Sequence, residues 1–304
     1  MSNSNNKNFF AVFGLLFGAV CWGIIWYPYR LLSEAGVSGV ASSFYTYIIT
    51  LVISSLFLGK YWRSVGKLPL SIVWLGLVAG WTNLSYVLAI IDGEVMRVML
   101  LFYLSPLWTL ILAHFWLKER TQFTGYMAII ASLVGAFVML HDPELGHFPL
   151  PRNVAEWLAV SAGIGFALTN VIARKSSHLT LTAKSYAIWI GVIVVSLLFV
   201  PLTQSTIPSP ANFRLVDWCV MILIALMLIA ATLFVQYGVS KIEATRASVL
   251  FLFELVVAAI AAYYLANETM DLNEWLGGGL IVVAAIFAAF HHQDNQHERF
   301  SGSD

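Results

Sequence analysis

The sequence has few charged residues and almost no cysteine. Only 11% of its 304 residues are charged, whereas about a quarter of the residues of an average soluble domain are. So few charges cannot cover a water-facing surface, which excludes an ordinary soluble globular protein. The formal net charge is zero, so no basic excess favours nucleic acid as a partner. The two cysteines, Cys21 and Cys219, lie in apolar runs, which excludes a disulfide framework and metal-ligand spacing, and we expect both to be buried.

What the sequence has instead is long apolar runs, and 60% of its residues are hydrophobic. A helix needs about 20 apolar residues to cross a hydrocarbon core of about 30 Å. The runs therefore predict an all-α integral membrane protein with ten transmembrane helices and no soluble catalytic domain. The predicted spans are Phe9–Tyr27, Gly39–Leu58, Leu70–Ile91, Val95–Leu117, Phe123–Leu140, Val154–Ala173, Ala183–Leu202, Val216–Val239, Ala247–Ala266 and Trp275–Phe290.

The order of polar and apolar segments predicts two five-helix halves. No small-residue cleavage pattern precedes Pro28, so we expect the first helix to be retained. If the N-terminus is cytoplasmic, 12 of the 16 lysines and arginines fall on the cytoplasmic side. This asymmetry predicts both termini inside a cell (inner or plasma) membrane. The expected segments are a cytoplasmic tail (1–8), the first half (9–140), an external linker (141–153), the second half (154–290) and a cytoplasmic tail (291–304).

The two halves also match each other in sequence. A shift of 149 positions places Glu94, Arg97 and Phe102 on the identical residues Glu243, Arg246 and Phe251. A shift of 144 positions places Trp22, Trp26 and Arg30 over Phe166, Asn170 and Arg174. Because five helices per half is an odd number, the halves must cross the membrane in opposite directions, as in the inverted repeats of many secondary transporters. The alternative is a duplicated scaffold without a transport role.

Two stretches resemble the drug/metabolite transporter superfamily and, within it, the EamA-type proteins with ten helices. They are LLFYLSPLWTLILAHFWLKER (100–120) and LFLFELVVAAIAAYYLANE (250–268), and each leads into a helix rich in Gly and Ala. Pro106 matches a proline that the family often has in its fourth helix. Glu254 matches a glutamate in its ninth helix, but Leu255 stands where the family often has a proline. Glu119 and Glu268 match the acidic residues that close the two stretches.

This resemblance implies a central cavity lined mainly by helices 1, 3, 4, 6, 8 and 9, with helices 5 and 10 at the periphery. It implies a transporter of small metabolites such as amino acids, nucleotide sugars or cations, and it suggests export. Pro106 removes a backbone hydrogen bond, so we expect the fourth helix to be kinked or broken near the midplane. The glycine pairs Gly14/Gly18 and Gly76/Gly80 predict close helix contacts.

Glu254 is the sharpest candidate for a functional residue. A charged group at the centre of a bilayer costs about 2.5–3.5 kcal/mol on insertion scales, so such residues usually serve solute or ion pathways. We therefore expect Glu254 to bind solute or carry protons; the alternative is a structural glutamate that caps a broken helix. Arg97 and Arg246 begin the fourth and ninth spans and are candidate gates, unless they only anchor the helices at the interface.

Trp22, Trp26 and Arg30 share one face of the first helix by their spacing. They are candidates for binding a planar, cationic or carboxylate-bearing solute, with Arg30 as a further gate; the alternative is an aromatic belt at the interface. Other candidates lie on helices that the resemblance assigns to the cavity, although polar side chains there can simply join helices. They are Asn83, Tyr86, Tyr103, Asn170, Gln236, Tyr237 and Phe251.

The sequence thus predicts a secondary active transporter, an exporter of a small organic metabolite such as an amino acid, that works by alternating access. Its expected partners are the solute, the lipid bilayer and protons, with a homodimer left open; no cofactor, metal or catalytic residue is expected. The alternatives are an importer or exchanger of the same fold for a cation, nucleotide or nucleotide sugar, and a lipid-modifying membrane enzyme. The scattered acidic residues Asp92, Asp142, Asp217 and Asp271 argue against the enzyme.

Overall fold

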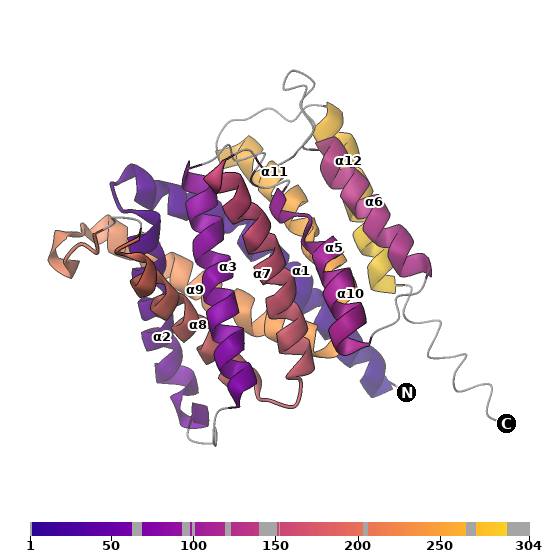
Figure 1. Cartoon of the computed structure of the whole chain (residues 1–304), viewed down its shortest axis with the longest axis horizontal. Coiled ribbons are helices and arrows are strands. Elements are labelled where there is room, and N and C mark those ends of the chain that lie inside the picture. Colours follow the sequence, from indigo (N-terminus) through magenta and orange to yellow (C-terminus); the bar gives the residue numbers. More distant parts are fainter. Residues whose placement is uncertain are drawn as a thin grey trace.

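Every regular element in the described part of the chain is a helix (Figure 1). The computed structural model describes residues 2–62, 69–92, 98, 101–118, 123–139, 151, 153–202, 206–265 and 272–290. The α-helices are α1 (Ser2–Glu34), α2 (Gly39–Trp62), α3 (Leu70–Asp92), α5 (Ser105–Leu112), α6 (Phe123–Met139), α7 (Val154–Lys175), α8 (Leu181–Phe199), α9 (Leu215–Lys241), α10 (Ala244–Phe251), α11 (Phe253–Leu265) and α12 (Leu272–Phe290). A π-helical turn, η1 (Ala113–Leu117), extends α5, and a short 3₁₀ turn, η2 (Pro210–Asn212), precedes α9.

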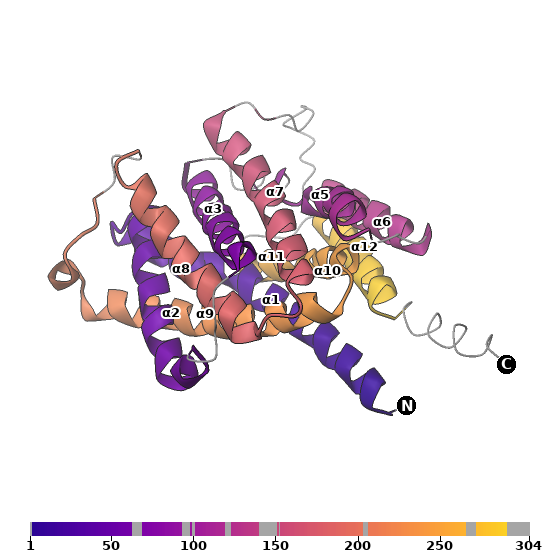
Figure 2. The ribbon, with the colours of Figure 1, turned by 60° about the horizontal axis from the view of Figure 1, so that its bottom comes forward.

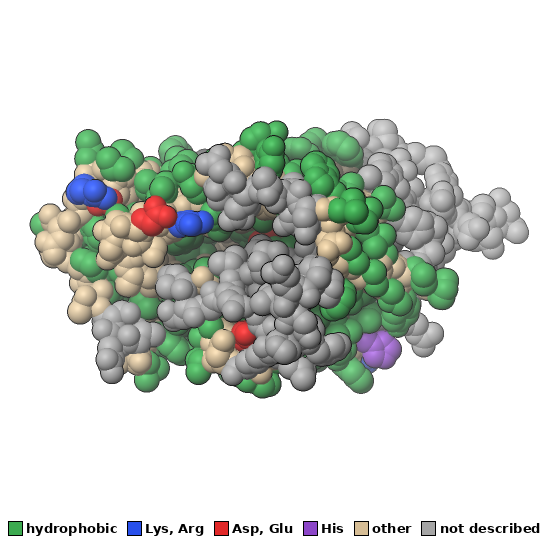
Figure 3. Space-filling model, turned by 90° about the horizontal axis from the view of Figure 1, so that it is seen from above, with side chains coloured by type: hydrophobic (Ala, Val, Ile, Leu, Met, Phe, Trp, Pro, Cys, Tyr) green, Lys and Arg blue, Asp and Glu red, His purple; other side chains and the backbone are tan. Residues whose placement is uncertain are grey.

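Six of the described helices are long and apolar enough to cross a membrane, namely α1, α2, α3, α7, α8 and α9. The other four predicted spans also coincide with helices (α5 with η1, α6, α10 with α11, and α12), which are shorter in the described residues. Large apolar side chains cover the outside; Leu56 and Phe115, for example, are 78% and 75% exposed. Around the grey residues in Figure 3 the surface is mostly hydrophobic, with few charges. The chain is therefore a multi-pass membrane protein.

The helices pack with partners from the other half of the chain. α1 lies along α9, and α3 packs against both α7 and α8. α2 packs against α8 and α9, while α6 and α12 form a pair at the edge of the bundle, beside α10 (Figures 1 and 2). The fifth and tenth predicted helices are thus peripheral, as the resemblance implies.

Glycines allow the closest of these contacts. A Cβ atom on Gly14 would lie 2.8 Å from the carbonyl oxygen of Phe234 in α9, closer than real Cβ contacts come. Gly76 in α3 likewise faces the backbone of Ala187 and Gly191 in α8. Both predicted glycine pairs therefore lie in tight helix contacts. Small residues let two backbones approach each other, which is how membrane helices associate without a hydrophobic driving force.

Two of the predicted spans are broken. The fourth has a turn at Tyr103 and Leu104, directly before α5, whose first turn contains Pro106; the predicted break is confirmed. The ninth has a turn at Leu252 between α10 and α11. Leu104 and Leu252 each donate a backbone hydrogen bond to the residue three positions earlier, at 3.4 and 3.1 Å. The ninth helix thus breaks without a proline.

Some predicted details differ from the structure. α1 starts at Ser2 and continues through Pro28 to Glu34, so residues 2–8 of the predicted tail are part of the helix. Once the apolar span is helical, adding turns at its ends costs little, and polar residues can follow it into water. Cys21 is buried as predicted, but Cys219 is exposed on the outside of α9, where a thiol behaves as a small hydrophobe.

Candidate functional site

Six aromatic side chains from five segments meet in the interior of the bundle. This aromatic cluster consists of Trp22, Tyr86, Phe102, Tyr103, Phe166 and Phe251. The rings of Trp22, Phe166 and Phe251 form a triangle with centroid distances of 5.1–5.8 Å. Phe102 connects this triangle to Tyr86 and Tyr103, with centroids 4.9–5.6 Å apart. The cluster therefore joins α1, α3, α7, α10 and the segment before α5.

The broken helices explain how two of these rings reach the interior. Phe102 and Phe251 each lie directly before a break. Gly163 in α7 faces the carbonyl oxygen of Phe102, and Gly23 in α1 faces that of Glu254; an added Cβ atom would lie 2.8 Å from either oxygen. Glycines in α1 and α7 thus let these helices pack directly on the broken segments.

Glu254 lies beside the aromatic cluster. It stands in the first turn of α11, just after the break, and its side chain is 8% exposed. Its carboxyl group interacts electrostatically with Tyr86 and Tyr103. The N-terminus of a helix favours a negative group, so this position also suits a structural role. The structure brings Glu254 together with Tyr86, Tyr103, Trp22 and Phe251, all of which the sequence had marked as candidates.

Three further candidates carry buried polar atoms. The amide nitrogen of Asn170 and the amide oxygens of Asn83 and Gln236 have no hydrogen-bond partner among the described residues, whereas the hydroxyl of Tyr103 interacts with the carboxyl group of Glu254. Asn83 donates a hydrogen bond of 3.3 Å to the hydroxyl of Tyr47 in α2. Buried polar groups are rarely left without a partner, so these three amide atoms are candidates for contact with a bound solute, and Asn83 also joins two helices.

The remaining described candidates make no ring contact with the aromatic cluster. Trp26 stacks edge-on with its neighbour Tyr27, and Arg30 is exposed and paired with Glu34 at 3.3 Å. Tyr237 is half-buried against the central core. Arg246 is partly buried in the first turn of α10, and it interacts with the Glu243 carboxylate. Arg97 lies outside the described residues.

A cluster of basic side chains at one end of α7, α8 and α9 was not predicted as a site. Lys184 is fully buried, and its ammonium donates to the carbonyl of Ala173 and to the hydroxyl of Ser240. Arg174 donates a hydrogen bond of 2.8 Å to the carbonyl of Ser240. These contacts join the ends of three helices. The sequence placed Lys184 with the loop charges, because hydropathy does not reveal a lysine that caps neighbouring helices.

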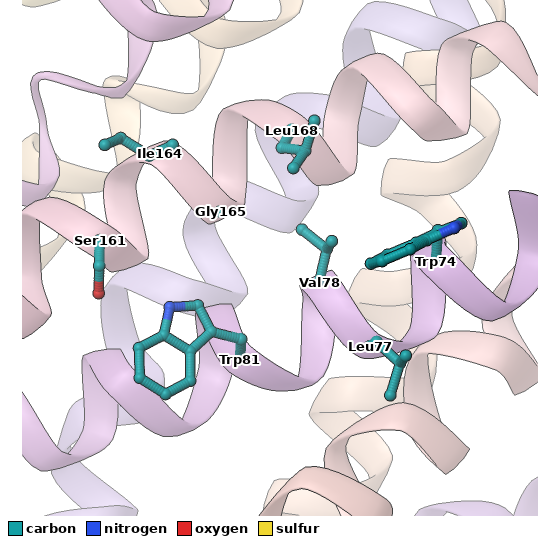
Figure 4. Close-up of a pocket in the computed structure, with 8 residues that line it drawn as sticks. All are labelled: Trp74, Leu77, Val78, Trp81, Ser161, Ile164, Gly165 and Leu168. Atoms are coloured by element: carbon teal, nitrogen blue, oxygen red, sulfur yellow. The ribbon is translucent and has the colours of Figure 1, made fainter.

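An apolar groove of about 390 Å³ runs between α3 and α7 (Figure 4). Trp74 and Trp81 lie on the α3 side, with Val78 between them, and Ser161 is the one hydroxyl-bearing side chain that lines it. Because Gly165 lines this groove whereas Phe166 belongs to the aromatic cluster, the two features lie on different faces of α7. The groove has no charged lining residue and is separate from Glu254.

The fold and the buried site together define a polytopic helical membrane protein with a polar group enclosed among its spans, as in secondary transporters. The chain belongs to the EamA-like transporter family, whose model matches residues 9–141 and 153–290. It is thus a membrane transporter and not an enzyme, as the sequence predicted.

Relatives of this chain include transporters for different solutes. It is 25% identical over 229 residues to the S-adenosylmethionine uptake transporter of Rickettsia prowazekii, covering 73% of this chain and 72% of the relative. It is 22% identical over 259 residues to the pseudopaline exporter CntI of Pseudomonas aeruginosa, covering 85% and 79%. A crystal structure with 16% identity has a TM-score of 0.71 and covers 91% of this chain and 96% of the other, which shows a shared fold.

Two members of the aromatic cluster, Phe102 and Phe166, were not among the predicted site residues. Both had appeared in the internal matches, where Phe102 pairs with Phe251 and Trp22 with Phe166. That pairing was the signal that could have identified them, because the binding sites of transporters built from inverted repeats lie at the interface of the repeats.

Proposed function

We propose that this protein is a secondary active transporter that carries a small organic solute by alternating access. Two inverted five-helix halves, 9–140 and 154–290, rock against each other around the aromatic cluster. In this scheme the site is closed in the present structure, and it opens to one side of the membrane when the halves rotate.

The helix contacts support two related halves. If the halves are exchanged, α1 takes the place of α7 and α3 that of α9. The contact of α1 with α9 is then matched by that of α7 with α3, and α1 with α11 by α7 with α5. The contacts α3 with α8 and α9 with α2 are matched in the same way. Such an exchange is expected when the two halves are repeats of one fold.

The observation that carries the proposal is the composition of the aromatic cluster. Its core consists of two residue pairs, Trp22 with Phe166 and Phe102 with Phe251, that the shifts of 144 and 149 positions relate. One member of each pair comes from each half. Any relative motion of the halves must therefore change the contacts within this cluster, which is the behaviour expected of an alternating-access site.

We place the protein in the cell membrane with both termini in the cytoplasm, following the distribution of lysine and arginine. We propose that it exports a metabolite such as an amino acid. The alternative is uptake or exchange. Among its relatives, one is named an uptake transporter and another an exporter, so both directions occur in proteins of this kind.

The test is transport in proteoliposomes with amino acids, organic cations and nucleotide sugars, measured both as uptake and as release of preloaded solute, with and without a pH gradient. We expect saturable transport of one solute class. Protein-free liposomes and a heat-inactivated sample are the controls. Failure to move any class in either direction would contradict the proposed function. The Glu254→Gln variant tests coupling: pH-driven transport that persists unchanged in this variant would exclude Glu254 as the proton carrier.

A further inference from the structure

We propose that the transported solute carries an organic cationic centre, a substituted ammonium or sulfonium group, which binds between Glu254 and the rings of the aromatic cluster. This inference rests on the proposed function and specifies the solute class that its site accepts.

The first step is the charge of the site. Glu254 is more than nine-tenths buried, and none of the described lysine or arginine side chains pairs with it. A lone carboxylate in an apolar interior is stable only when a proton or a cation neutralises it. The protein itself supplies no cation to this position in its described residues. A solute with a positive charge would supply one.

The second step is the kind of cation. An inorganic cation such as Na⁺ or Ca²⁺ needs several oxygen ligands. The described side chains that interact with the Glu254 carboxyl group are those of Tyr86 and Tyr103, and both of their rings contact Phe102. Ring faces attract weakly hydrated organic cations, and tryptophan attracts them most. The site therefore suits an organic cation better than a metal ion.

The third step is the orientation of the solute. The rings of Trp22, Phe166 and Phe251 contact one another in this closed state. We expect them to part when the halves rotate and to surround an alkylated cationic group next to Glu254, which follows Phe251 by one turn along the chain. The hydroxyl of Tyr103 interacts with the Glu254 carboxyl group and can also contact the polar part of the solute. An anionic solute would meet the carboxylate without a compensating charge, which the site would reject.

The test compares pairs of molecules that differ by one positive charge. The first pair is choline and its uncharged isostere 3,3-dimethylbutan-1-ol; the second is S-adenosylmethionine and S-adenosylhomocysteine. Binding to the purified protein and transport in proteoliposomes are measured separately for each probe. We expect binding of at least one charged member to exceed that of its neutral partner by about tenfold or more, since tenfold corresponds to 1.4 kcal/mol.

Variants then show which side chains produce the preference for the charged probe. Glu254→Gln keeps the shape of the side chain and should abolish the preference for the charged member. Trp22→Phe should weaken cation binding by about two- to fivefold, the range expected for one cation–π contact. Glu34→Gln and Trp157→Phe make the same chemical changes at exposed positions away from the aromatic cluster and should leave binding unchanged. Size-exclusion profiles and melting temperatures establish that each variant is folded.

The outcomes separate the two proposals. Glu254-dependent binding of a cation without transport would support the cationic site and contradict the transport function. Transport of neutral or anionic solutes, with no charged probe bound, would overturn the cationic site and leave the transport function standing. A cation preference that survives in Glu254→Gln would also overturn the cationic site. If no probe binds and no solute of the wider panel moves, both proposals are wrong.

Discussion

Gly23 offers the most direct test of how α1 packs against the broken ninth helix. A Cβ atom on Gly23 would lie 2.8 Å from the carbonyl oxygen of Glu254 and 2.8 and 2.9 Å from Cβ and Cγ1 of Val257. All three are atoms of the backbone or of a stiff β-branched side chain, so they cannot swing away. Overpacking of this kind costs about 1–3 kcal/mol. Gly23→Ala should therefore separate α1 from α11 and displace Glu254.

A glycine-to-alanine change in a helix also stabilises it, by about 0.5–1 kcal/mol. Gly279→Ala provides the control, because an added Cβ atom there meets no atom within 4 Å. The difference in unfolding free energy between the two variants should therefore isolate the clash, at about 1–3 kcal/mol. Unfolding in mixed micelles of rising SDS content, followed by tryptophan fluorescence, measures it. Equal stability of the two variants would refute the proposed contact between α1 and the break.

Two further predictions concern the end of the bundle and its orientation. Lys184→Ala should destabilise the protein by about 2 kcal/mol or more, because it empties a fully buried position and leaves the carbonyl of Ala173 and the hydroxyl of Ser240 without the ammonium donor. Lys241→Ala, at an exposed position, is the control, and detergent melting curves that coincide would contradict the role of Lys184. Ala35 and His178 are both exposed in loops, so each can be replaced by cysteine in a background without native cysteines. Ala35→Cys should react with an impermeant thiol reagent only from the outside. His178→Cys should react with it only from the cytoplasm. Labelling of both from the same side would rule out the proposed orientation.

Hydropathy predicted the helices well because the bilayer demands them. A span must satisfy every backbone hydrogen bond internally and present an apolar surface, so length and composition suffice to find it. The break before Pro106 was predictable for a similar reason, since proline cannot donate to the preceding turn. The break at Leu252 was not, because no residue type there forbids a continuous helix. This break is revealed by the tertiary structure, in which Gly23 of α1 packs against the carbonyl oxygen of Glu254.

The members of the site were harder to predict than the spans. In a chain that is 60% hydrophobic, an aromatic residue that faces lipid looks the same as one that faces the interior. Trp22 and Trp26 are four residues apart, yet only Trp22 contacts the aromatic cluster, whereas Trp26 contacts Tyr27. Helical spacing puts both tryptophans on one side of α1, but it does not show which of them the neighbouring helices cover. That depends on packing between the two halves, which no local pattern encodes.

In the proposed mechanism the two halves are repeats of one fold, and they differ in charge at one matched position. The shift of 149 positions that relates Phe102 to Phe251 also relates Ser105 to Glu254. Ser105 is buried at the start of α5, as Glu254 is at the start of α11. Related halves allow inward-open and outward-open states of similar energy, because each state is close to the other with the halves exchanged. A second carboxylate at Ser105 would add another costly buried charge. A single carboxylate near the interface of the halves can serve both states, since it is one group that either opening exposes.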